Sequence, residues 1–77
     1  MRQTIALCYG PWTAVKGAAV QLRHGPEGLI CLRTERGEIS TLLPLLESAA
    51  EGDKASTLLR HLTQEEAALA FQTARKS

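Results

Sequence analysis

Two cysteines and two histidines are the residues of this chain with the widest chemical range: Cys8, His24, Cys31 and His61. Zinc prefers such side chains, but its sites usually draw ligands in pairs that lie about two to five residues apart. No two of these residues are that close in the sequence. We therefore expect no metal site and no cofactor, and we interpret both cysteines as small apolar residues.

A cysteine can also act as a nucleophile, provided that a neighbouring base or cation stabilises its thiolate. Cys31 lies in the apolar run "GLICLR", which is typical of a packed strand. Cys8 belongs to the stretch "CYGPW", which lacks the second cysteine of a redox Cys-x-x-Cys motif. No other set of acids and bases converges in the sequence, so we expect that the protein is not an enzyme.

Nucleic-acid recognition would use the segment that follows Leu46. The run "ESAAEGDKASTLLRHL" is compatible with two helices around a glycine turn, as in a helix-turn-helix. The polar side of the second helix would carry Lys54, Ser56, Thr57, Arg60 and His61. Acidic residues at positions 47, 51 and 53 lie where phosphates would sit, so this interpretation is the alternative rather than the preferred one.

The elements that position these residues begin with a β-hairpin in "AAVQLRHGPEGLICLRTE", residues 18–35. The central "GPEG" fits a type I turn followed by a left-handed glycine, with Gly25 paired to Leu29. One face then receives the pairs His24 with Ile30, Leu22 with Leu32, and Val20 with Thr34. The opposite face receives Arg23 with Cys31, Gln21 with Arg33, and Ala19 with Glu35. One face is mostly apolar and the other mostly polar, which supports this register.

A strand is also expected before the hairpin, in "QTIALCY" at residues 3–9, where Gly10-Pro11 would end it. Tyr9 would share the core-facing side of this strand with Ile5 and Leu7. Trp12 would then close the end of the core. If Trp12 instead proves exposed, this stretch is the first place to search for a binding partner.

Beyond a turn at residues 35–38, the hydrophobic period becomes that of helices. The first helix would be capped by Ser40 or Thr41, carry Pro44 in its first turn and end at Gly52. Its apolar stripe would be Leu42, Leu45, Leu46 and Ala49. Asp53 would cap a second short helix that buries Ala55, Leu58, Leu59 and Leu62. A capping box of Thr63 and Glu66 would open a third helix that buries Ala67, Ala70, Phe71 and Ala74.

These elements predict one α+β domain over residues 1–77, with strands in residues 1–40 and helices in residues 41–76. We expect a small two-layer domain. Its three-stranded antiparallel sheet, made of the N-terminal strand plus the β-hairpin, would be followed by three short helices packed on one face.

The composition and net charge of the chain disfavour nucleic acids and membranes as partners. The chain has 77 residues, of which 44% are hydrophobic and 22% charged, and its net charge is +1. Proteins that bind the phosphate backbone usually carry a clustered basic face, which is not evident here. The apolar runs are too short for a membrane span or a signal peptide. We therefore expect a cytoplasmic protein with both thiols reduced and no membrane partner.

The remaining interpretation is a non-enzymatic protein-binding module. It would be a small accessory or inhibitory factor, of the kind that bacteria and mobile elements encode, that acts by occluding a partner protein. The candidate partner-binding residues are Gln21, Arg23, Leu29, Arg33, Glu35 and Arg36. A homodimer that pairs sheet edges or leucine-rich helices is a further arrangement. The alternative is a nucleic-acid-binding transcriptional regulator that uses the second helix.

Overall fold

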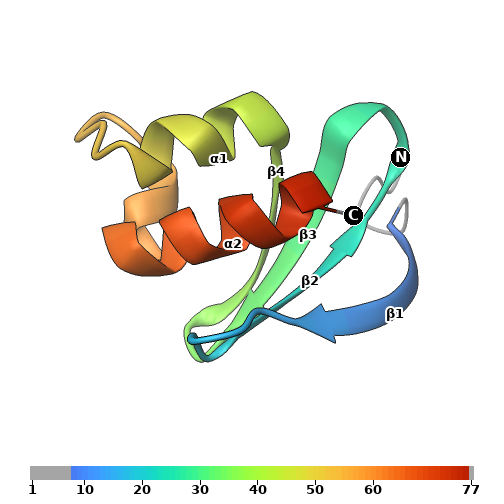
Figure 1. Cartoon of the computed structure of the whole chain (residues 1–77). Helices are drawn as coiled ribbons and strands as arrows, with labels where there is room; N and C mark the ends of the chain where they lie inside the picture. The colour runs from blue at the N-terminus through green and yellow to red at the C-terminus, as the bar shows by residue number, and fades with distance from the viewer. Residues whose placement is uncertain (1–7, 77) are drawn as a thin grey trace.

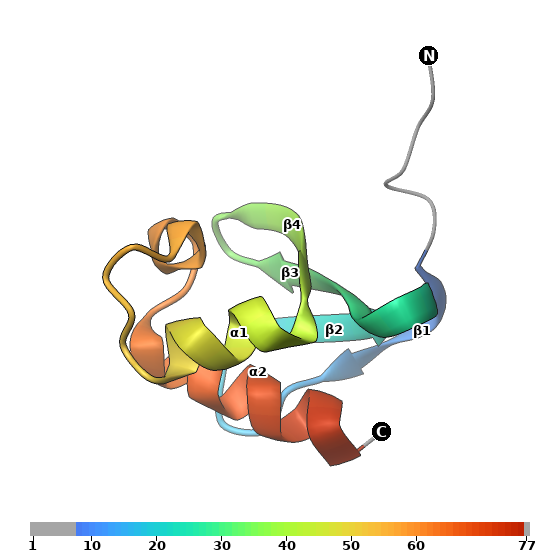
Figure 2. The same cartoon turned by 90° about the horizontal axis from the view of Figure 1, so that it is seen from above.

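The computed structural model describes residues 8–76, which fold into two layers (Figure 1). An antiparallel sheet contains β1 (Tyr9–Ala14), β2 (Val20–His24), β3 (Leu29–Thr34) and β4 (Gly37–Leu42), in that order. Helices α1 (Leu43–Ala50) and α2 (Gln64–Lys76) lie side by side over one face of this sheet (Figure 2). The predicted α+β class is confirmed. The described residues form four strands and two α-helices, however, where the sequence predicted three of each.

The hairpin of β2 and β3 has the predicted register. Leu22 pairs with Leu32 on the face that the helices cover, while Arg23 pairs with Cys31 on the opposite face. The backbone N–H of Gly25 donates to the carbonyl oxygen of Leu29 at 2.9 Å, as the predicted turn requires. The turn type differs from the prediction, because the three-residue 3-10 turn η2 (Pro26–Gly28) holds Glu27 at φ 58°. A type I turn would keep that residue right-handed.

Strand β1 lies later in the chain than predicted. The predicted strand at residues 3–9 falls outside the described residues except for its last two positions. Gly10-Pro11 does not end a strand but lies within β1, where the register shifts between Tyr9 and Thr13. A bulge on an edge strand tolerates proline, and Gly10 supplies the left-handed φ of 82° that the bulge uses. Tyr9 is 61% exposed, so the prediction that its ring points into the core is wrong.

Strand β4 occupies residues that were predicted as a turn and the start of a helix. Ile39 pairs with Leu32 and Thr41 pairs with Ile30, so β4 extends the apolar face of the hairpin by one strand. Because the backbone of residues 37–42 pairs with β3, Thr41 belongs to the sheet and does not serve as the N-cap of the helix. The boundary between strands and helices therefore falls after Leu42 instead of after residue 40.

Helix α1 keeps part of its predicted pattern. Pro44 lies in the first turn, and Gly52, at φ 89°, follows the C-terminal end. The N-cap is Leu42, which makes no side-chain cap, so neither predicted cap residue serves. Of the predicted apolar stripe, Leu46 and Ala49 are fully buried, whereas Leu42 and Leu45 are 46% and 55% exposed.

The predicted second helix is only a 3-10 turn, η3 (Thr57–Arg60), and Ser56 rather than Asp53 caps it. The third predicted helix is confirmed as α2 together with its capping box. The N–H of Thr63 donates to Glu66 Oε1 at 2.9 Å, and the N–H of Glu66 donates to Thr63 Oγ1 at 3.0 Å. Each side chain thus satisfies a backbone donor that the helix start leaves unpaired.

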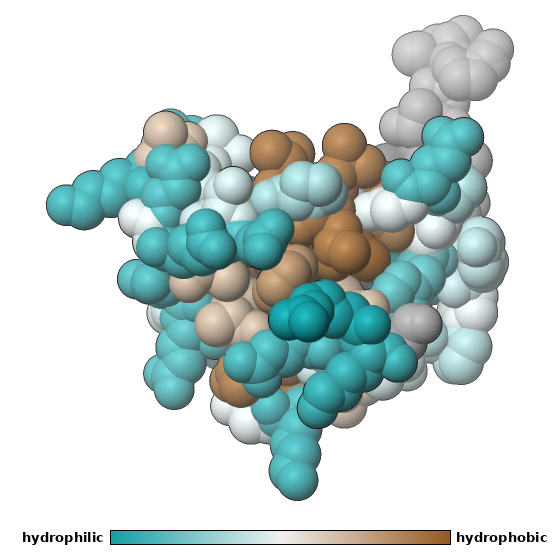
Figure 3. Space-filling model, turned by 45° about the horizontal axis from the view of Figure 1, so that its top comes forward, coloured by the Kyte–Doolittle hydropathy of each residue, from teal (hydrophilic) through white to brown (hydrophobic). Residues whose placement is uncertain are grey.

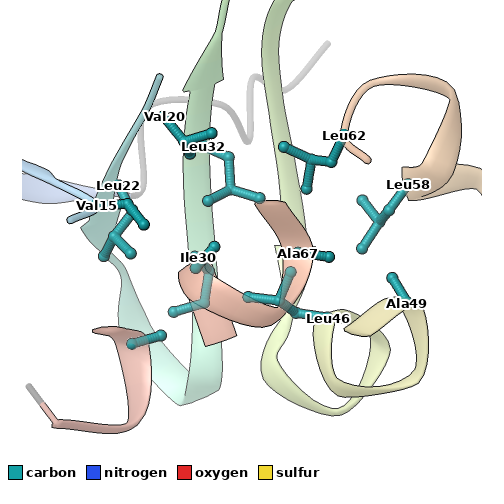
Figure 4. Close-up of a cluster of buried hydrophobic side chains, with 12 residues drawn as sticks. Val15, Val20, Leu22, Ile30, Leu32, Leu46, Ala49, Leu58, Leu62 and Ala67 are labelled. Atoms are coloured by element: carbon teal, nitrogen blue, oxygen red, sulfur yellow. The ribbon is translucent and has the colours of Figure 1, made fainter. Parts of the chain in front are cut away.

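The core lies between the sheet and the helices (Figure 4). Leucine and isoleucine side chains of β2 and β3 meet alanine and leucine side chains of the helices and η3. Its largest fully buried members are Val15, Leu22, Ile30, Leu32, Leu46 and Leu62. Small alanines on α2 let the helix approach the sheet closely, and Ala67 and Ala70 are both fully buried. This packing occupies one face of the sheet and leaves the other uncovered.

Candidate binding surface

The outer sheet face is the face of the sheet that the helices leave uncovered (Figure 2). Because successive side chains of a strand alternate between faces, the register decides which residues it carries. Its members are Trp12 of β1, Gln21 and Arg23 of β2, Cys31 and Arg33 of β3, and Glu38 and Ser40 of β4. The confirmed hairpin register thus brings Gln21, Arg23 and Arg33, all predicted partner-binding residues, onto one surface.

Trp12 lies at the centre of a cationic cluster on this face. The guanidinium carbon Cζ of Arg33 lies 4.2 Å from the centroid of the Trp12 ring, and that of Arg23 lies 5.0 Å from it. A guanidinium over an indole face is attracted by the ring's quadrupole. Trp12 is therefore half-buried among arginines on the outer sheet face, and the prediction that it closes the core is wrong.

Arg33 is held by its neighbours as well as by the ring. Its Nη1 donates to Gln21 Oε1 at 3.2 Å, and its Nε lies 3.5 Å from Glu38 Oε2. These contacts span β2, β3 and β4. The side chains of Arg33 and Glu38 remain 43% and 64% exposed, so the ion pair is screened by water and adds little stability. Its effect is to place a counter-charge beside Arg33 and to restrict the orientation of its side chain.

Arg23 has a different environment from Arg33. Its Nε is buried and has no hydrogen-bond partner, the only such side-chain nitrogen or oxygen within residues 8–76. None of the ion pairs of that region involves Arg23. Within residues 8–76 no hydrogen bond or ion pair involves either of its Nη nitrogens, and neither of them is fully buried. Arg23 is thus a positive charge with a buried Nε and with no acceptor among the residues that the structure describes.

A disulfide links Cys8 to Cys31 on the same face. The expectation that both thiols are reduced is therefore wrong for this structure, and neither sulfur is a thiolate nucleophile or a metal ligand in this state. Both residues are 9% exposed. The bond joins the residue before β1 to the middle of β3, and so it ties the bulged edge strand to the centre of the sheet.

The other predicted partner-binding residues lie elsewhere. Glu35 and Arg36 form the turn between β3 and β4. Arg36 reaches toward the helices, where its Nη1 donates to the carbonyl oxygen of His61 at 2.9 Å and lies 3.5 Å from Glu66 Oε1. Arg36 therefore connects the two layers and is not part of the outer sheet face.

Leu29, the remaining predicted residue, borders a separate hollow where β4 passes into α1. The hollow has a volume of about 480 Å³, and its apolar lining includes Leu29, Leu42, Leu45 and Leu58. Apolar surface gathers in this region between hydrophilic side chains (Figure 3). The hollow carries polar groups at its rim, such as Asp53, but no arrangement of acid and base that would make it a reaction centre.

The residues of the predicted nucleic-acid face lie around η3. Lys54, Thr57 and Arg60 are exposed, whereas His61 is half-buried and its carbonyl is occupied by Arg36. Ser56 Oγ accepts a hydrogen bond from the N–H of Leu58, so it serves the turn. A four-residue 3-10 turn is too short to enter a DNA groove as a recognition helix does. These residues lie near one another, but the described residues do not form the second helix that was predicted to carry them.

Among residues 8–76, no three His, Cys, Asp or Glu side chains converge in a way that would hold a metal ion. Within the same range, neither helix has the length and apolar character needed to cross a lipid bilayer.

Comparisons of the chain with protein-family models, with curated proteins and with solved structures gave no match.

Sequence reasoning missed the disulfide, and it placed Trp12 at the end of the core, with an exposed Trp12 near a binding partner as the alternative. Trp12 and Ala14 are two positions apart, so in a strand that continued past Gly10-Pro11 both side chains would point to the same, outer face. The signal for the disulfide was the number of cysteines, since two cysteines allow only one pairing.

Proposed function

We propose that this chain is a non-enzymatic protein-binding module that recognises its partner through the outer sheet face. The observation that carries the proposal is the cluster of Trp12, Arg23, Arg33 and Gln21, which we call the Trp12 cluster. Tryptophan and arginine are the residue types that contribute most to binding energy at protein interfaces. Here they lie together on a face that no helix covers.

The rigidity of this surface supports the same function. Gln21, Arg23 and Arg33 of the Trp12 cluster extend from the central strands β2 and β3. Trp12 extends from the edge strand β1, and the disulfide links the residue before β1 to β3. A surface that is already ordered loses less conformational entropy on binding than a mobile one. The face is thus suited to binding a partner without rearrangement, and such a module acts by occupying the partner's surface.

Affinity capture with matched variants tests this function. The wild-type protein, an Arg33→Ala variant and an Arg75→Ala control would be immobilised and exposed to lysate of the source organism. Arg75 also lies over an aromatic ring, that of Phe71, but on α2, so the control removes the same chemistry from the opposite layer. We expect a protein that the wild type and the control retain and that the Arg33→Ala variant loses.

Two results would overturn the proposal. One is a captured protein that all three chains retain equally, because it would place the interface elsewhere. The other is capture that nuclease treatment abolishes, because that would indicate nucleic acid as the bound species. Light scattering of the purified chain at two concentrations adds a check on self-association, since a homodimer through this face would also lose mass in the Arg33→Ala variant.

A further inference from the structure

We propose that the partner segment bound by the outer sheet face is acidic, and that Arg23 receives one of its carboxylates. This inference rests on the proposed function and specifies the chemistry of its partner. It comes from the difference between the two arginines of the Trp12 cluster. Arg33 already has Glu38 as its counter-ion, whereas Arg23 has none among the described residues.

The packing of Arg23 prepares it for a carboxylate. Its Nε is buried and unpaired, a state that is costly for a donor on a charged group. Neither Nη nitrogen has an acceptor among the described residues, and the guanidinium carbon Cζ lies 5.0 Å from the centroid of the Trp12 ring. A guanidinium binds a carboxylate through parallel N–H donors, and it does so more strongly where water is already partly excluded. A bound carboxylate would therefore act as the counter-ion that Arg23 lacks among the described residues.

The surroundings of Arg23 favour an acidic protein segment over a nucleic acid. Single-stranded nucleic acids stack their bases on free aromatic faces and follow rows of cations with their phosphates. Two guanidiniums already lie over the Trp12 ring. Glu38 places a negative charge beside Arg33 and would repel a second phosphate, so Arg23 is the one cation of the Trp12 cluster without a counter-ion among the described residues. One carboxylate fits that charge, and the exposed parts of Trp12 and Gln21 remain for the rest of the segment.

A random peptide library displayed on phage supplies the test without knowledge of the natural partner. The wild-type protein would be used for selection, and the enriched peptides would be sequenced. We expect Asp or Glu at one fixed position of the selected peptides. The binding of a selected peptide would then be compared with that of its counterpart in which the acidic residue becomes Asn or Gln. The fluorescence of Trp12, the single tryptophan of the chain, reports binding at the site itself.

Loss of the carboxylate should weaken binding by about tenfold or more, in line with the strength of a charged hydrogen bond. The Arg23→Gln variant should lose affinity to the same extent, and Arg23→Lys should lose part of it because the ammonium lacks the planar pair of donors. Arg75→Gln is the matched control and should bind as the wild type does. The altered peptide keeps the test valid if Arg23→Gln fails to fold, because it leaves the protein unchanged.

Several results would overturn the inference, and they differ from failure of the proposed function. Selected peptides that lack an acidic position, or that bind Arg23→Gln as well as wild type, would contradict the inference while still showing peptide binding. Tighter binding of an oligothymidine than of any acidic peptide would contradict it in favour of nucleic acid. A wild-type protein that selects no peptide and captures no Arg33-dependent protein would contradict both proposals.

Discussion

Reduction of the Cys8–Cys31 disulfide is predicted to lower the free energy of unfolding by about 3 kcal/mol. The two cysteines are separated by 23 positions in the sequence, and the bond closes that segment into a loop. In the chain-entropy account, the unfolded state of a loop of this size loses conformational freedom worth about 3.5 kcal/mol. Small domains of this length have a total stability of only about 4–12 kcal/mol. The bond should therefore provide a large share of the stability.

Urea denaturation, followed by far-ultraviolet circular dichroism with and without a phosphine reductant, measures this effect. For a small protein whose denaturant slope is near 1 kcal/mol per molar urea, the midpoint should fall by about 3 M on reduction. A Cys8→Ala/Cys31→Ala double variant is the control, and its midpoint should not respond to the reductant. A thiol titration of the unfolded, unreduced wild type should detect no free thiol.

Equal midpoints before and after verified reduction would refute this reasoning. That result would mean that the bulged edge strand is held to β3 by packing and backbone hydrogen bonds alone. A thiol titration that finds both cysteines free in the purified protein would refute it earlier, because the bond that closes the loop would not exist.

Four substitutions test other parts of the structure by the same denaturation assay. Leu32→Ala should cost about 2–5 kcal/mol because this side chain is fully buried, and a smaller loss would contradict the assigned core. Thr63→Ala should cost about 1 kcal/mol through loss of the α2 cap, and an unchanged midpoint would show that the capping box is dispensable. Gly52→Ala should cost about 1–2 kcal/mol because φ is 89°, whereas a stabilised variant would mean that this backbone conformation is incorrect. Trp12→Ala should cost less than the roughly 3–5 kcal/mol of a core tryptophan, because the ring is only half-buried and is held by two cation–π contacts, and a loss of that size would show that the ring packs in the core.

The hairpin and α2 were predictable because local signals agreed with each other. The Gly25 to Gly28 turn and the alternation on both sides of it point to one register, and the structure has that register. Thr63 and Glu66 mark the start of α2 through a pairing that needs no tertiary contact. Where two independent short-range signals coincide, the sequence alone determines the element.

The strands at the two sheet edges were not predictable in this way. Residues 37–42 form β4 because β3 offers them a partner strand, and no local pattern in "GEISTL" separates them from the helix that follows. In β1, Gly10-Pro11 has the local chemistry of a turn, and only the pairing with β2 makes it a bulge. The location of Trp12 follows from that bulge, so the centre of the candidate site depended on a long-range contact that the sequence did not reveal.

Three of the four residues of the Trp12 cluster nevertheless followed from the register. Gln21, Arg23 and Arg33 were assigned to one polar face before the covered face was known, and they share that face in the structure. Arg36 lies off this face, because a turn residue with a long side chain can reach either layer, and its acceptors at His61 and Glu66 come from distant sequence.

We propose that the outer sheet face around Trp12 is the binding surface, and chemical-shift mapping would locate that surface residue by residue. An isotope-labelled sample of the protein would be titrated with the captured partner or with a selected acidic peptide. We expect the largest shifts at the indole N–H of Trp12 and at the amides of Gln21, Arg23 and Arg33. Shifts confined instead to the hollow between β4 and α1, at Leu45 and Leu58, would contradict it.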